Sequence, residues 1–390
     1  MSATGDPQHL DPWALQISRR LEGQIRSEIA AAGGLLPFDR FMELALYAPG
    51  LGYYVAGAAK LGPGGDFVTA PEVSPLFGAC LANQCADALG RVGGGDILEL
   101  GPGSGALAVQ VLHRLHALGC LPRRYLLLEV SPDLRERQGR AIAQQAPALA
   151  DRCQWLERLP EGFRGVVLAN EVLDAMPVHR FRVGQDGTTE ECFVRASDQA
   201  LQEVWRPVRS PGLGEAVAAL QAEGLAVAPG YSSEVNLRLG PWAGALADSL
   251  AAGLVLLVDY GYPRSAYYQP DRTMGTLMCH WRHQAHPDPY RNIGLQDITA
   301  HVDFSAVARA GMGAGLALAG FATQGHFLIG CGIDGLIQGG EDAPDLDLAL
   351  QAKQLLLPTA MGERFKVLGL ARGVEGPWRG FSVRDLSDRL

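Results

Sequence analysis

A short glycine-rich segment has the residue types and spacing that hold a small anionic group. Residues 99–105 read Glu-Leu-Gly-Pro-Gly-Ser-Gly, after an apolar run at 97–100 and before a helical pattern. Glycines let the backbone turn tightly and approach a ligand closely, and the N–H groups that open a helix favour a carboxylate or a phosphate. We therefore expect Gly101, Gly103 and Gly105 to cradle a cofactor.

Two acids bear on the identity of that cofactor. Gly101, Gly103 and Ala106 also satisfy the loose dinucleotide fingerprint, so the glycines leave S-adenosylmethionine and a nicotinamide dinucleotide open. Glu99 lies two residues before the first glycine, where class I methyltransferases typically have a carboxylate and dinucleotide folds an apolar residue. Glu129, after the next apolar run, can accept both ribose hydroxyls of either cofactor. Glu99 therefore favours S-adenosyl-L-methionine, with S-adenosylhomocysteine as the product.

A second cluster of polar residues follows the apolar run at 166–169, where residues 170–177 read Asn-Glu-Val-Leu-Asp-Ala-Met-Pro. Ligands of open α/β sheets lie at the carboxyl ends of the strands, so Asn170 and Glu171 should face the reactive end of the cofactor. If this turn is helical, Glu171 and Asp174 share one face and present paired carboxylates. Such a pair binds and orients a guanidinium, which indicates an arginine acceptor. Alternatively, Asp174 caps a helix and Glu171 binds only the cofactor.

Further polar residues raise the question of other site groups. Asp259 ends another apolar run and is one more acid that could face the site. Four histidines, His280, His283, His286 and His301, suggest a metal centre at first sight. They lack other ligands at regular spacing, and methyl transfer to nitrogen needs no metal. We expect no metal, and we expect the histidines to pack or to line a substrate loop.

These motifs need a scaffold that brings them to one edge of a sheet. From residue 96, short apolar runs alternate with helical stretches, which is the rhythm of βαβ units. The predicted strands are 97–100, 125–129, 154–156, 166–169 and 254–259. A small antiparallel meander is predicted at 181–183, 192–194 and 203–205. The fold class is therefore α/β, with a doubly wound, mostly parallel sheet of the class I methyltransferase type.

Three consecutive regions are predicted along the chain. Residues 1–90 form an N-terminal helical region, with helices at 13–32 and from Asp39 and a loop that lids the site. Residues 91–334 form the core, with an insertion at about 178–250, and residues 335–390 form a helical extension that includes 348–357. The uncharged segment 310–333 is interpreted as a buried helix followed by a strand at 327–329, because its seven glycines would leave backbone groups unpaired in lipid.

Composition limits the partners and the compartment. The chain has 390 residues, a formal net charge of −9 and seven cysteines. A negative charge disfavours nucleic acid and favours a cationic substrate. An odd number of scattered cysteines indicates free thiols in a reducing compartment. No basic residue precedes Arg19, so neither a secretory signal nor a transit peptide is evident, and we expect a cytoplasmic bacterial protein.

Taken in order, several motifs resemble those of the MidA family of S-adenosylmethionine-dependent methyltransferases. They are residues 47–54, 65–78, 99–105, 170–177, 258–261, 275–277, 282–283, 297–304 and 361–368, so the resemblance covers nearly the whole chain. It implies symmetric dimethylation of an arginine in a partner protein, since a mitochondrial relative acts on a subunit of respiratory complex I. It also implies that Asp66 and Thr69 lie beside the cofactor and Glu72 near the acceptor pocket.

Two alternatives stay open at the level of sequence. A nicotinamide-dependent oxidoreductase would use the glycine loop for a pyrophosphate. A non-catalytic assembly factor would bind S-adenosylmethionine and transfer nothing, because a fold does not fix a function. The identity of the acceptor and the oligomeric state do not follow from these residues.

Overall fold

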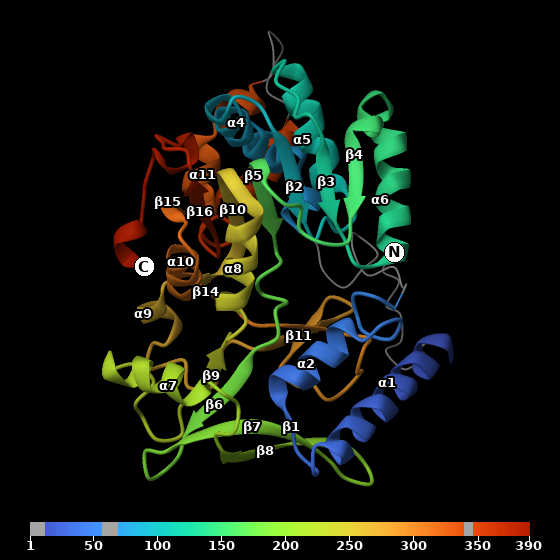
Figure 1. The fold of residues 1–390 in the computed structure, drawn as a ribbon, viewed down its shortest axis with the longest axis vertical. Coiled ribbons are helices and arrows are strands. Elements are labelled where there is room, and N and C mark those ends of the chain that lie inside the picture. The colour runs from blue at the N-terminus through green and yellow to red at the C-terminus, as the bar shows by residue number, and fades with distance from the viewer. Residues whose placement is uncertain (1–11, 57–68, 339–345) are drawn as a thin grey trace. The chain divides into compact units, whose positions relative to one another are not determined.

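The computed structural model describes residues 12–56, 69–338 and 346–390 (Figure 1). The chain divides into two compact units, each discontinuous in sequence. The larger unit comprises Ala59–Ala175, Arg238–Gln269 and His301–Leu390. The smaller unit comprises Met1–Ala58, Met176–Leu237 and Pro270–Ala300. The predicted regions 1–90, 91–334 and 335–390 describe order along the chain rather than these units, and they stay a prediction.

An eight-stranded sheet forms the centre of the larger unit. Seven strands lie in the order β15-β16-β10-β5-β2-β3-β4, and β14 pairs with the end of β10. The strands are β2 (Asp96–Leu100), β3 (Tyr125–Leu128), β4 (Cys153–Leu156), β5 (Phe163–Asn170), β10 (Leu250–Tyr262), β14 (Val302–Asp303), β15 (Ala317–Thr323) and β16 (Phe365–Arg372). Strands β4, β3, β2, β5 and β10 are parallel, and β16 is antiparallel to both of its neighbours. The five strands predicted from apolar runs are confirmed.

Helices cover both faces of this sheet. They are α3 (Ala70–Val73), α4 (Pro75–Val92), α5 (Ala106–Ala117), α6 (Pro132–Gln145), α8 (Leu239–Ser249), α9 (Arg264–Tyr267), α10 (Phe304–Gly313), α11 (Gln324–Gly330), α12 (Ile333–Ile337) and α13 (Leu346–Leu356). Ile97 and Leu256 share one hydrophobic core with α4 and α5. Leu98 and Leu257 are equally buried on the opposite face, because successive strand residues alternate. Helices α8 and α10 pack against each other and against β10. The arrangement is the doubly wound α/β fold that was predicted.

The uncharged segment 310–333 differs from its prediction in one respect. Residues 327–329 do not form a strand: they lie in helix α11, and the strand of this segment is β15. Helix α11 begins where it does because the Thr323 hydroxyl accepts the N–H of His326 and caps the first turn. Across the parts of the chain that the structure describes, no helix has the length and apolar character of a membrane span.

The C-terminal part contributes more than a helix. Helix α13 confirms the helix predicted around 348–357. Strand β16, which the sequence did not predict, lies between β10 and β15 inside the sheet. Its residues Val367, Leu368 and Leu370 are buried, so the strand completes the hydrophobic core.

In its described residues, the smaller unit combines two sheets with three helices. Its elements are α1 (Pro12–Ala31), β1 (Leu36–Pro37), α2 (Phe38–Tyr47), β6 (His179–Val183), β7 (Thr189–Ala196), β8 (Leu201–Pro207), α7 (Leu213–Ala222), β9 (Ser232–Val235), β11 (Met278–Trp281), β12 (Gln284–His286) and β13 (Asp297–Thr299). Strands β6, β7 and β8 pair antiparallel and confirm the predicted meander. Helix α1 buries Ile17, Leu21, Ile25 and Ile29, the stripe that predicted it.

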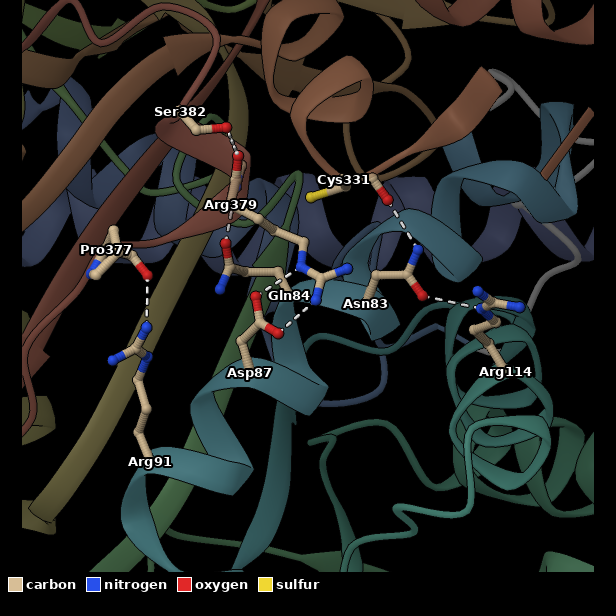
Figure 2. A network of polar contacts seen from close by, with 10 residues as sticks. Asn83, Gln84, Asp87, Arg91, Arg114, Cys331, Pro377, Arg379 and Ser382 are labelled. Atoms are coloured by element: carbon tan, nitrogen blue, oxygen red, sulfur yellow. Dashed lines mark hydrogen bonds and ion pairs between the residues drawn. The ribbon is translucent and has the colours of Figure 1, made fainter. Parts of the chain in front are cut away.

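Polar side chains on α4 hold distant segments of the larger unit together (Figure 2). The Asn83 side chain donates to the Cys331 carbonyl at 2.7 Å and accepts from Arg114 Nε at 2.9 Å. The Gln84 carbonyl oxygen accepts the N–H of Gly380 at 2.9 Å. Both α4 side chains are buried, so these bonds satisfy groups that water does not reach.

The next turn of α4 binds the same C-terminal segment through charges. Arg379 Nε lies 2.6 Å from an Asp87 carboxylate oxygen, and the pair is bidentate. Arg91 donates to the Pro377 carbonyl at 2.9 Å, and its guanidinium lies over the Trp378 ring at 5.2 Å from the centroid. Helix α4 therefore anchors residues 377–380 along two turns of its surface.

Replacing Asn83 should destabilise the chain more than replacing Asp87. Asn83→Ala leaves a buried carbonyl without its donor, which costs about 1–3 kcal/mol of unfolding free energy. Asp87→Ala breaks a partly solvent-screened ion pair and should cost less than about 1 kcal/mol. Urea unfolding curves of the two variants measure the difference. Equal losses would contradict the view that the buried amide is the stronger anchor.

Candidate cofactor and acceptor site

The glycine loop connects the end of β2 to the start of α5 in the larger unit. Gly101, Gly103 and Gly105 have φ values of 60°, 55° and 85°, in the left-handed region that favours glycine. The Gly101 N–H donates to the Leu128 carbonyl at 3.1 Å, which ties the loop to β3. A Cβ at Gly101 would also lie 3.2 Å from a methyl group of Val172. The loop therefore needs glycine both for its turn and for close approach.

Glu129 follows β3 and is fixed by a buried hydrogen-bond network. Its carboxylate accepts the N–H of Ser131 at 2.8 Å and the side-chain amide of Gln138 at 3.2 Å. The same Gln138 amide donates to the Gly103 carbonyl at 2.9 Å, and its oxygen accepts the Trp155 indole N–H at 2.7 Å. Gln138 therefore links the glycine loop to the carboxylate that we expect at the ribose.

Sequence reasoning missed Gln138. The residue lies on α6, where it and Ile142, four positions later, are the buried residues of the helix. A glutamine on the buried stripe of an otherwise polar helix is the signal that could have identified it. Such a residue must find partners for its amide, and here they are the Gly103 carbonyl of the glycine loop, the Glu129 carboxylate and the Trp155 indole.

Glu99 lies on β2 and is almost completely buried. Its carboxylate accepts the Tyr125 hydroxyl at 2.6 Å. Burial raises the pKa of Glu99 to about 7, against the opposing effect of the Tyr125 hydrogen bond. The carboxyl group is therefore half ionised near neutral pH, so a cationic group placed beside it would shift it towards its charged form.

The segment that precedes α4 lies against the glycine loop. The Thr69 carbonyl accepts the N–H of Glu72 at 2.9 Å and so starts helix α3. The Glu72 carboxylate accepts a hydrogen bond from the Ser104 hydroxyl, inside the loop. Gln110 on α5 donates to the Pro71 carbonyl at 2.7 Å. Glu72 thus lies beside the glycine loop, Thr69 lies at the start of the short helix that carries Glu72, and Asp66 lies outside the described residues.

Glu171 is the first residue after β5 and has an unusual backbone conformation. Its φ of 53° is in the left-handed region, which is rare and costly for a residue with a side chain and clusters at ligand sites. Its N–H donates to the Val258 carbonyl at 2.9 Å. The neighbouring Asn170 donates to the Glu171 carboxylate at 3.2 Å. The buried Asn170 side-chain oxygen has no hydrogen-bond partner among the described residues and is available to a ligand.

Asp174 and Asp259 lie close together beneath this turn. Residues 171–174 do not form the helix that would place Glu171 and Asp174 on one face. Instead, the Asp259 side chain binds the backbone of this turn. One Asp259 oxygen accepts the N–H groups of Leu173 at 3.0 Å and Asp174 at 3.2 Å. Burial raises the pKa of Asp174 to about 6. Burial, together with repulsion from Asp174 and Glu171, raises the pKa of Asp259 well above its usual value.

Among the described residues, the histidines are not grouped as metal ligands. His280, His283 and His286 belong to the smaller unit and His301 to the larger. Within residues 12–56, 69–338 and 346–390, no three His, Cys, Asp or Glu side chains are grouped so that they could hold a metal ion. The His301 ring contacts Tyr260 and Tyr262, with centroids 5.1 and 5.3 Å away, which is an aromatic packing role.

The larger unit has the groups that S-adenosylmethionine requires. The Glu129 carboxylate can accept ribose hydroxyls, the glycine loop leaves room for a ligand backbone, and the Asn170 oxygen can accept a polar hydrogen. The acids at the ends of β5 and β10 would stabilise a cation beside the cofactor's reactive end. The arrangement can therefore hold an adenosyl cofactor and a positively charged acceptor.

Comparisons with known proteins agree with this geometry. Protein arginine methyltransferase NDUFAF7, mitochondrial, from Mus musculus is 30% identical over 374 residues, which cover 86% of this chain and 81% of that protein. The Danio rerio protein of the same name is 29% identical and covers 91% of this chain and 88% of its own. Both relatives match most of this chain and most of their own length.

Solved structures are similar over an even larger share. A Burkholderia thailandensis protein crystallised with S-adenosylhomocysteine has a TM-score of 0.93 and 42% identity and covers 99% of this chain and 100% of that chain. A native structure from the same organism has a TM-score of 0.90 and 41% identity, with the same coverage.

Residues 80–322 match the model of a family described as S-adenosyl-L-methionine-dependent methyltransferases. This match covers more than half of the chain, and it decides between the two cofactors that the glycines left open. The cofactor is S-adenosyl-L-methionine, and the chain belongs to this family of methyltransferases, as its resemblance to the MidA family implied.

Proposed function

We propose that this methyltransferase acts on arginine, transferring methyl groups to a guanidinium of a partner protein with symmetric dimethylation as the outcome. The observation that carries the proposal is the group of acids Glu171, Asp174 and Asp259 at the carboxyl ends of β5 and β10. Relatives at 29% and 30% identity are named protein arginine methyltransferases, which supports the same acceptor.

Three acids in a largely buried place favour a cationic acceptor. Burial, together with repulsion from Asp174 and Glu171, raises the pKa of Asp259, and a bound cation would relieve that repulsion. A guanidinium has five N–H donors in a planar fork that matches carboxylate oxygens. In our proposal, Glu171 and Asp174 bind this fork, orient one nitrogen and localise a lone pair on it.

Methyl transfer to a guanidinium releases one proton, because the acceptor and its methylated product carry the same charge. A base for this proton needs a pKa near the working pH. Burial raises the pKa of Asp174 to about 6, so at pH 7 its carboxyl group is mostly ionised and can accept the proton. We therefore assign Asp174 as the base and Glu171 as the residue that orients the guanidinium.

The bound cofactor supplies an electrophilic methyl group on its sulfonium. Glu129 accepts the ribose hydroxyls, and the backbone of the glycine loop holds the methionyl end. Transfer then depends mainly on proximity and orientation between the methyl group and the oriented nitrogen. The other residues that we assign are Asp66, Thr69, Glu99 and Asn170 for the cofactor and Glu72 for the acceptor side.

The partner in this proposal is a protein with an accessible arginine, and a subunit of respiratory complex I is the candidate that the MidA resemblance suggests. A second candidate function is a non-catalytic assembly factor that binds the cofactor. It would use the same Glu129 and glycine loop but would not need the acids after β5. Loss of transfer in an acid variant therefore separates the two functions.

Glu171→Gln should abolish methyl transfer and leave the cofactor site intact. We expect incorporation of tritiated methyl groups into proteins of a bacterial lysate to fall by about 100-fold, because the acceptor nitrogen is no longer oriented. The affinity for S-adenosylhomocysteine, measured by calorimetry, should stay within about threefold, since Glu171 is not in the ribose network. Mass spectrometry should locate the wild-type label on arginine.

The matched control is Glu157→Gln, an exposed glutamate just after the parallel strand β4, which should transfer at the wild-type rate. Wild-type label on a residue other than arginine would contradict the proposed acceptor. Binding of S-adenosylhomocysteine without any transfer by the wild type would support the assembly factor instead.

Cofactor affinity should rise with pH through the titration of Glu99. Its pKa of about 7 means that the carboxyl group is mostly protonated at pH 6 and mostly ionised at pH 8. Because the ammonium of the methionyl end prefers a carboxylate, affinity for S-adenosylhomocysteine should increase about tenfold over this range. Calorimetry at pH 6, 7 and 8 tests this. Glu99→Gln should show a flat profile, and a wild type as flat as the variant would exclude contact between Glu99 and the ammonium.

A further inference from the structure

We infer that Asp259 is a positioning residue for methyl transfer, which holds the turn that carries Glu171 and Asp174 in its working conformation. The inference rests on the proposed function for its kinetic consequence. Asp259 itself contacts the backbone of this turn, and Glu171 and Asp174 are the groups that meet the acceptor.

The turn is bonded to two adjacent residues of β10. Val258 lies opposite Asn170 in the parallel pairing of β10 with β5, and its carbonyl accepts the Glu171 N–H at 2.9 Å. The next residue, Asp259, accepts the N–H groups of Leu173 and Asp174 on one carboxylate oxygen. The Val258 carbonyl thus holds the beginning of the turn, and the Asp259 side chain holds its end.

These bonds explain how Glu171 keeps its left-handed backbone. A non-glycine residue at positive φ costs about 1–3 kcal/mol and persists only where its surroundings over-determine it. The bond of Glu171 fixes its own N–H, and the two Asp259 bonds fix the residues that follow. Without Asp259, the peptide after Glu171 loses the oxygen that accepts two of its N–H groups and can relax to an ordinary conformation.

Asp259 is unlike a carboxylate that stabilises the fold by an ion pair. It is 1% exposed and has no salt bridge within the described part of the chain. Lys366, its partner in the register of β10 with β16, donates instead to the carbonyls of Glu363 and Arg364. A buried carboxylate beside two other acids is costly, and here the backbone N–H groups are what compensate it.

Asp96 is the matched comparison. It is also buried, lies on the parallel strand β2 and accepts a backbone N–H, that of Arg124, at 3.0 Å. Its carboxylate is ion-paired with the Arg124 guanidinium at 2.6 Å. Asp96 begins its strand, at the amino end of the sheet, whereas Asp259 lies near the carboxyl end of β10. If Asp259 had a purely structural role, substitutions of Asp259 and of Asp96 should change stability and methyl transfer in the same way.

The test compares Asp259→Ala, Asp259→Asn and Asp96→Asn in the full chain. Alanine removes the oxygen that accepts the two N–H groups, so kcat for tritiated methyl transfer into lysate proteins should fall by about 10-fold to 100-fold. Asparagine keeps one acceptor oxygen, so kcat should recover to within about threefold of wild type. Affinity for S-adenosylhomocysteine should be unchanged in both, because Asp259 has no bond to the glycine loop or to Glu129.

Hydrogen exchange gives a readout that needs no acceptor. The N–H groups of Leu173 and Asp174 should exchange faster in Asp259→Ala and near the wild-type rate in Asp259→Asn. Asp96→Asn should lower the melting temperature and leave both kcat and these two N–H groups unchanged. A variant that lost stability, cofactor binding and transfer in proportion would indicate a structural role and overturn the inference.

The remaining outcomes separate the inference from the proposed function. If the wild type transfers no label, the proposed function fails, and unchanged exchange in Asp259→Ala would then overturn the positioning role independently. If the wild type transfers label and Asp259→Ala is equally active, the inference fails and the proposed function stands. If Asp259→Asn is as inactive as alanine with normal exchange, the charge of Asp259 acts rather than its position, which also overturns the inference.

Discussion

Parallel pairing of β5 with both β2 and β10 is the constraint on which the site depends. The register places Leu100 opposite Ala169 and Val258 opposite Asn170, so these strands end at one edge. Parallel strands present their carboxyl ends together, and each is followed there by a loop or side chain with its own chemistry. The glycine loop, the turn after β5 and Asp259 meet because of this ladder and not because of closeness in sequence.

The same edge gathers carboxyl groups away from water, which is unfavourable for their ionised forms without a ligand. Glu99, Asp174 and Asp259 are all nearly buried, and burial raises the pKa of each. A buried carboxylate is ordinarily protonated or paired. Cationic groups on the cofactor and on the acceptor would provide the missing partners. In the proposed function, binding of such cations would recover the cost of burying these carboxylates and would favour positively charged ligands over neutral ones of the same shape.

The sequence predicted the parts of the fold that depend on local pattern. Apolar runs identified β2, β3, β4, β5 and β10, and the glycines and acids identified the loop and its neighbours. The incorrect predictions concern segments whose conformation depends on residues that are distant in the sequence. The apolar residues 327–329 suit a helix or a strand equally, and the cap at Thr323 selects the helix. Residues 171–174 form a turn because Asp259, 85 positions from Asp174, takes their N–H groups. Gln138 forms hydrogen bonds with Gly103, Glu129 and Trp155. These residues are far apart in the sequence, so no local pattern could identify the network.

Strand β16 and the segment that follows it give the larger unit a particular order of assembly. The strand lies between β10 and β15, both of which precede it in the chain, and Asn83, Gln84 and Asp87 hold segments around it to helix α4. During synthesis, β15 has no partner in the sheet until residues 365–372 have left the ribosome. The glycine loop, the turn after β5 and Asp259 all precede β15 in the chain, so they are synthesised before it. The residues of the cofactor edge therefore precede, in the order of synthesis, the strand that joins β15 to the rest of the sheet.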